Sequence, residues 1–195
     1  MRFYNLFFVG LFMLACSYAS AQQKVTFATH PTISPNADYV VFSFEGDLWR
    51  VDATGGQALR LTAMSGEEIN PRISPDGKWL AFSSNQNGNL DVYVMPIDGG
   101  EIKQLTFHDG QDYVDSWSWD SKEIYFTSSR YNRFTSFKVS LKGETPERIF
   151  SHYFNTIHQV TETPSGDLLF NNSWESFTSA NRKRYKGALD RKSVV

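Results

Sequence analysis

The side chains that could perform hydrolysis in this chain are its four histidines and its many serines. A hydrolytic site needs a histidine with an acidic partner and a nucleophile, and a zinc site needs ligands at defined spacings. Neither H-E-x-x-H nor G-x-S-x-G occurs in the 195 residues. We therefore assign no catalytic, cofactor-binding or metal-binding residue and interpret the histidines as loop or core residues. They are His30, His108, His152 and His158.

Three acidic residues in the segment HDGQDYVD invite a calcium hypothesis: Asp109, Asp112 and Asp115. Oxygen ligands at short intervals around a glycine can bind a hard cation, but an EF-hand loop requires alternating ligands and a terminal glutamate. That spacing is absent here. We predict solvated loop carboxylates and no metal.

Basic residues gather near the end of the chain, where they could bind an acidic peptide or lipid headgroups. We interpret them instead as a solvated strand or loop. The net charge of −2 and the pI near 6.1 give no reason to expect nucleic acid as a partner. The run comprises Arg182, Lys183, Arg184, Lys186, Arg191 and Lys192.

The first 21 residues are typical of a signal peptide. Arg2 supplies a positive end, an apolar stretch runs from residue 6 to 15, and Ala19-Ser20-Ala21 offers small residues for cleavage. Cleavage before Gln22 would yield an exported, periplasmic protein without cysteine, because Cys16 is the single cysteine. Lipid attachment at Cys16 is the alternative, which Met13 disfavours.

An apolar run recurs along the chain at intervals of 40, 44 and 44 residues, each time ending in phenylalanine. A turn precedes each run. In Ser74-Pro75-Asp76-Gly77, proline fixes the second position and glycine takes a left-handed conformation. Related turns occupy residues 34–37, 118–121 and 163–166, and Ala37 at positive φ would cost about 1 kcal/mol. The phenylalanines are Phe42, Phe82, Phe126 and Phe170.

Each unit continues with an alternating segment and a short outer segment, as in residues 46–51 and 59–62. Four short strands per unit and no helical pattern predict an all-β chain, a β-propeller with four-stranded antiparallel blades. A two-sheet sandwich is the competing interpretation. We expect about four blades of an incomplete ring, in a chain that is a fragment. The expected blades cover residues 25–65, 66–109, 110–152 and 153–195.

Most aromatic residues fall at strand or repeat-equivalent positions, which predicts packing between blades rather than a sugar-binding platform. Tyr131 and Phe134, in the segment SSRYNRF, are better candidates for contact with a ligand. The residues expected to pack between blades are Trp49, Trp79, Tyr93, Trp117, Trp119, Tyr125 and Trp174.

The segment PRISPDGKWLAFSSNQNGNLDVYVMPIDGGEIKQLT, residues 71–106, resembles the TolB-type propeller repeat. The segment SFEGDLWRVDATGGQALRLT, residues 43–62, is similar to the first blade of exported bacterial tricorn-type serine peptidases. In that family the first propeller precedes a second propeller, a PDZ-like domain and a catalytic domain. Nothing in this sequence matches those later parts, so the resemblance assigns no catalytic residue here.

The resemblance implies a non-catalytic propeller region that gates or binds peptide substrates for a catalytic domain outside this chain. Peptide or protein ligands would bind through the channel or the rim, and the remaining blades and the catalytic domain would be partners. Two alternatives stay open: a TolB-like periplasmic protein-binding propeller without enzymatic activity, and the propeller of a prolyl-oligopeptidase-like hydrolase. Self-association into a homo-oligomer also stays open.

Overall fold

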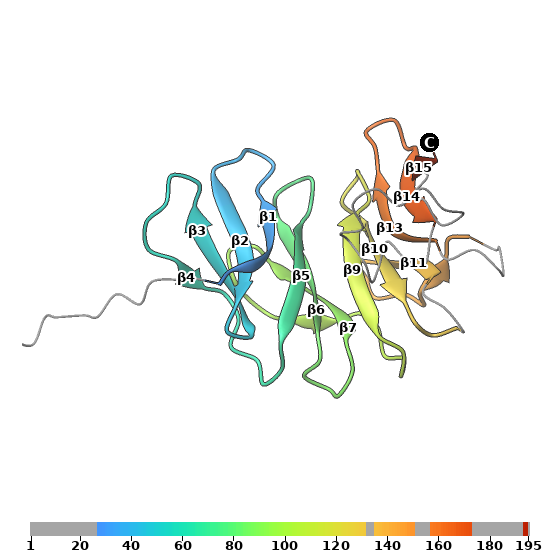
Figure 1. The fold of residues 1–195 in the computed structure, drawn as a ribbon, viewed down its shortest axis with the longest axis horizontal. Coiled ribbons are helices and arrows are strands. Elements are labelled where there is room, and N and C mark those ends of the chain that lie inside the picture. Colours follow the sequence, from blue (N-terminus) through green and yellow to red (C-terminus); the bar gives the residue numbers. More distant parts are fainter. Residues whose placement is uncertain (1–26, 132–134, 151–156, 173–192, 195) are drawn as a thin grey trace, which may run out of the picture.

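The computed structural model describes residues 27–131, 135–150, 157–172 and 193–194, which form strands and no helix. The strands make four antiparallel sheets that follow one another in chain order (Figure 1). The first sheet contains β1 (Thr29–Ile33), β2 (Tyr39–Phe44), β3 (Asp47–Asp52) and β4 (Leu59–Arg60), and the second contains β5 (Glu68–Ile73), β6 (Trp79–Ser84), β7 (Asp91–Pro96) and β8 (Lys103–Gln104).

The third and fourth sheets repeat the same up-and-down order, with three strands of the fourth sheet described. This arrangement confirms the predicted propeller blades. The third sheet contains β9 (Asp112–Trp117), β10 (Glu123–Ser128), β11 (Thr135–Ser140) and β12 (Glu147–Arg148), and the fourth contains β13 (Ile157–Glu162), β14 (Leu168–Asn172) and β15 (Ser193–Val194).

The predicted turns join the first and second strands of every blade. Their fourth residues all adopt positive φ: 57° at Ala37, 72° at Gly77, 62° at Ser121 and 88° at Gly166. In the first three turns the leading serine oxygen accepts a hydrogen bond from a main-chain N–H five residues on, for example Trp79 N at 2.9 Å. The strain at alanine and serine is therefore tolerated within an otherwise well-bonded turn.

The second strand of the second blade, β6, is apolar on both faces because different neighbours cover the two faces. Leu80 and Phe82 pack in one cluster with Val41 of the first blade. Ala81, which lies between them in sequence, packs in another cluster with Val114 of the third blade. The core is thus distributed between successive blades, which the two-sheet sandwich does not predict.

Two glycines 44 residues apart let the loops before β5 and β9 approach neighbouring backbone. A Cβ at Gly66 would lie 2.5 Å from Gln86 N, and one at Gly110 would lie 2.8 Å from Arg130 N. Larger side chains would displace the loops that lead into these first strands. Within the described ranges, no helix is long and apolar enough to cross a membrane.

Candidate functional site

The first strands of the four blades, which we call the inner strands, are β1, β5, β9 and β13. Each lies at one edge of its sheet and pairs with a single neighbour. Consecutive inner strands contact one another, whereas β4 lies at the opposite edge of the first sheet (Figure 1). The inner strands therefore form an arc that carries main-chain N–H and C=O groups not used in sheet pairing.

Every inner strand carries a β-bulge at an equivalent position. The register shifts between Thr29 and Thr32, between Ile69 and Arg72, at Asp115, and between His158 and Thr161. Bulges redirect side chains and recur beside functional sites. In three of the bulges a residue other than glycine takes positive φ, at a cost of about 1 to 2 kcal/mol each. These residues are His30 (49°), Asn70 (52°) and Gln159 (56°).

Side chains around the bulges connect the second blade to the third. Arg72 Nε donates a hydrogen bond to the main-chain oxygen of Asp115 at 2.6 Å. Trp117 Nε1 donates in the opposite direction, to the main-chain oxygen of Arg72 at 2.8 Å. The two bonds fix the relative positions of β5 and β9.

Asp115 also connects the third blade to the fourth. Its carboxylate accepts a hydrogen bond from Thr127 Oγ1 at 2.6 Å, and Thr127 Oγ1 in turn accepts one from Gln159 N at 3.2 Å. The main-chain N–H groups of Val160 and Gln159 also lower the pKa of Asp115. The neighbouring Ser116 Oγ donates to Val160 O at 2.7 Å. Residues of β9 are thus bonded to their own blade and to the next.

One carboxyl group of this cluster, that of Asp115, has a pKa near neutral pH. Asp115 is half-buried, and burial raises its pKa to about 7, against the lowering effects of the Thr127 bond and the Arg72 charge. Burial, followed by the Arg72 charge, lowers the pKa of His30. The arc therefore offers hydrogen-bond donors, acceptors and one fixed positive charge, which suits binding.

The prediction of solvated loop carboxylates was wrong for two of the three acids. Asp112 begins β9, is fully buried and pairs with Arg130 Nη2 at 2.6 Å, so an ion pair compensates its burial. Asp115 lies farther along the same strand. Asp109 does lie exposed in a loop. In the part of the chain that the structure describes, no three potential metal ligands lie together.

Two histidines lie as predicted. His108 is in an exposed loop, where its Nδ1 accepts from Gly110 N at 2.9 Å, and His158 is buried in β13. His30 lies in the inner strand β1, which the sequence interpretation missed. Several predicted features lie outside the described residues: the leader with Cys16, Phe134, His152, Trp174 and the basic residues from 182 to 192.

The aromatic residues mostly pack as expected, with one exception. Tyr93 is buried in one cluster with Val41 and Leu48 of the first blade. Trp119, predicted to pack between blades, has 53% of its surface exposed because it occupies the tip of a turn. Tyr131, the predicted ligand contact, is 59% exposed and stacks on Phe137 at 6.0 Å. Its role in binding stays a prediction.

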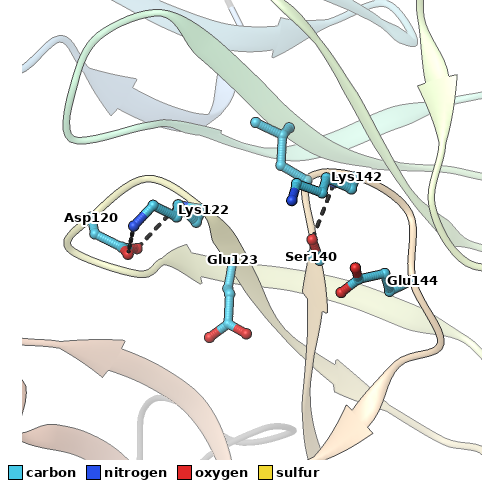
Figure 2. Close-up of a pocket in the computed structure, with 7 residues that line it drawn as sticks. Asp120, Lys122, Glu123, Ser140, Lys142 and Glu144 are labelled. Atoms are coloured by element: carbon cyan, nitrogen blue, oxygen red, sulfur yellow. Dashed lines mark hydrogen bonds and ion pairs between the residues drawn. The ribbon is translucent and has the colours of Figure 1, made fainter.

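A separate hollow of about 380 Å³ lies between two turns of the third blade (Figure 2). Its charges largely compensate one another: Lys122 Nζ donates to Asp120 at 2.8 Å, and Lys138 bonds Glu123. This mixed and internally paired lining favours no ligand class. The lining residues are Asp120, Lys122, Glu123, Ser140, Leu141, Lys142 and Glu144.

Comparison with known proteins identifies similar sequences. The family described as the tricorn protease N-terminal beta propeller domain matches residues 25–194. The chain is 38% identical over 92 residues to tricorn protease homolog 1 of Streptomyces coelicolor, an alignment that covers 46% of this chain and 8% of that protein. It therefore spans less than a tenth of this curated relative.

Solved structures show the same fold. TolB from Acinetobacter baumannii superposes with a TM-score of 0.59 at 22% identity, over 74% of this chain and 37% of that one. The tricorn protease crystal structure gives a TM-score of 0.57 at 12% identity, over 82% of this chain and 21% of that one. These likenesses bear on the fold alone.

Proposed function

The chain belongs to the tricorn protease N-terminal β-propeller family, and from that premise we propose that it is the non-catalytic, peptide-admitting region of an exported tricorn-like serine peptidase. In this proposal the catalytic groups belong to other parts of the parent protein. Residues 1–21 would direct export to the periplasm before being removed.

The observation that carries the proposal is the arc of inner strands. Apart from groups already bonded to neighbouring blades, such as Asp115 O and Val160 O, the outer edges of these strands offer main-chain groups that can bind an extended polypeptide irrespective of its sequence. The bulges and the bonds between blades hold this lining in a defined shape. A surface of this kind can accept many unfolded peptides while leaving cleavage to another domain.

The test uses the full-length protein that contains this sequence. Thr161 is an exposed residue of the inner strand β13, and Thr161→Trp would add bulk to the arc. We expect kcat/KM for a long unfolded polypeptide to fall about tenfold, while kcat/KM for a short chromogenic peptide stays within about twofold. Ser165→Trp, in an exposed turn of the same blade, is the matched control.

Three outcomes would count against the proposal. Equal losses for long and short substrates would show a general effect on folding or on the catalytic domain. No loss for either substrate would show that peptides do not pass the inner strands. Binding of unfolded polypeptide without cleavage by the full-length protein would favour the alternative of a binding propeller without enzymatic activity.

A further inference from the structure

Arg72 differs from three other arginines that the structure describes. Arg50, Arg60 and Arg130 each form an ion pair with an aspartate. Among the described residues no carboxylate lies within ion-pair distance of Arg72, which is half-buried on the inner strand β5. Burial lowers its pKa, and the more distant Asp115 charge opposes this only in part. A partly desolvated charge is unfavourable unless an opposite charge or hydrogen bonds compensate it.

The hydrogen bonds of Arg72 orient its guanidinium without neutralising it. Nε donates to Asp115 O at 2.6 Å and Nη1 donates to Pro71 O at 2.9 Å. Both acceptors are main-chain carbonyl groups. A guanidinium carries five N–H donors in a planar fork, so these bonds leave donors for a bidentate contact with a carboxylate.

The titratable neighbours of Arg72 balance its charge only in part near neutral pH. The Asp115 carboxylate accepts a hydrogen bond from Thr127, and burial raises its pKa to about 7, so near neutral pH it is partly uncharged. His30, on the adjacent inner strand, has a lowered pKa because of burial and the Arg72 charge. A neutral imidazole does not compete with Arg72 for an anion.

We propose that Arg72 is a carboxylate-binding residue of the inner-strand arc and that it contacts an acidic side chain or the free C-terminus of a bound peptide. This inference rests on the proposed function, because it assumes that peptides reach the inner strands. A contact with Arg72 would make binding selective for carboxylates, whereas the main-chain groups of the arc bind peptides irrespective of sequence.

The experiment measures binding of fluorescein-labelled peptides to the full-length protein, inactivated by a covalent serine-directed inhibitor. Three peptides share one neutral sequence: one has an amidated C-terminus, one has a free C-terminus, and one is amidated with a single internal glutamate. We expect at least one carboxylate-bearing peptide to bind about tenfold more tightly than the neutral amidated peptide. The peptide that shows this preference identifies the carboxylate's source.

Arg72→Gln should abolish the preference and leave the affinity of the neutral amidated peptide within about twofold. Lys78→Gln, which removes an exposed charge from the turn of the same blade, should retain the preference. Arg72→Lys keeps the charge without the planar fork and should retain part of the preference. If Arg72→Gln fails to fold, the wild-type preference should still weaken as salt is raised from 0.05 to about 0.5 M.

The contrary results separate the two proposals. Equal affinity of the wild type for all three peptides would overturn the role of Arg72 and leave peptide binding intact. Equal weakening of all three peptides by Arg72→Gln would assign Arg72 a purely structural role between blades. If no peptide binds the wild type, the proposed function itself fails.

Discussion

The inner strands and the second strands of the same blades are built differently. β6 pairs with β7 in uninterrupted register and is almost wholly buried, as is β10 with β11. β5 and β9 carry bulges, polar side chains and hydrogen bonds to the next blade. The difference separates two tasks: the second strands supply apolar burial, and the inner strands supply a shaped polar surface.

The largest expected effect comes from removing apolar burial in a second strand. Phe82 is fully buried and stacks on Tyr93, so Phe82→Ala should lower the free energy of unfolding by about 4 kcal/mol. Denaturant unfolding of the full-length protein, followed by propeller fluorescence, measures this loss. Trp119→Ala, at an exposed turn, should change it by less than about 1 kcal/mol. Similar losses for both variants would contradict the assignment of stability to the second strands.

A smaller effect concerns the charge buried among the inner strands. The pKa of Asp115 is raised from 3.8 to about 7, so the folded state binds more protons than the unfolded state between these pH values. Stability should therefore fall as pH rises from about 4 to 7, by roughly 3 kcal/mol after allowance for partial exposure. Asp115→Asn should remove this part of the slope. Parallel stability curves for wild type and variant would refute the shift.

Two substitutions at equivalent turn positions should change stability by smaller amounts and in opposite directions. Ala37 has φ of 57°, so Ala37→Gly should stabilise the first blade by about 1 kcal/mol. Gly77→Ala, at the equivalent position, should destabilise the second blade by a similar amount, because φ is 72° there. The added Cβ meets nothing closer than 3.9 Å, so no steric clash adds to this cost. Thermal unfolding of both variants tests the pair. Changes of the same sign would show that contacts outweigh backbone strain here.

The smallest expected effects come from glycine substitutions at two bulge residues with positive φ. Asparagine tolerates left-handed backbone better than glutamine does, so Asn70→Gly should stabilise by only a few tenths of a kcal/mol. Gln159→Gly, in the equivalent bulge, should stabilise by about 1 kcal/mol. Denaturation midpoints measured side by side give the ranking. The reverse order would mean that side-chain contacts, and not φ, set the energy of these bulges.

The repeated turns and apolar runs allowed the blade fold to be predicted, because both features are local. The fourth turn position adopts positive φ even at Ala37 and Ser121, where the sequence departs from glycine. The Ser121 hydroxyl also accepts a hydrogen bond from Asp76 N at 3.0 Å, so Ser121 helps to join the third blade to the second.

The candidate site could not be predicted in the same way. The bulged positions hold histidine, asparagine, aspartate and glutamine, so no shared residue type marks them. The contact between Arg72 and Asp115 depends on how two blades pack, and neither residue differs locally from a surface charge. For Asp112 and Asp115, closeness to a glycine-containing loop suggested exposure, whereas both lie within β9.

The hydrogen bonds that join successive blades share a spacing that bears on how the chain acquires its structure. The bonds from Asp76 N to Ser121, from Trp117 to Arg72 and from Ser116 to Val160 link residues 45, 45 and 44 positions apart. Each blade therefore needs only the next 44 or so residues of chain, about one repeat, before these bonds to its successor can form. Until then the apolar face that the successor covers stays exposed. The length of chain that must be present is thus one repeat and not the whole protein.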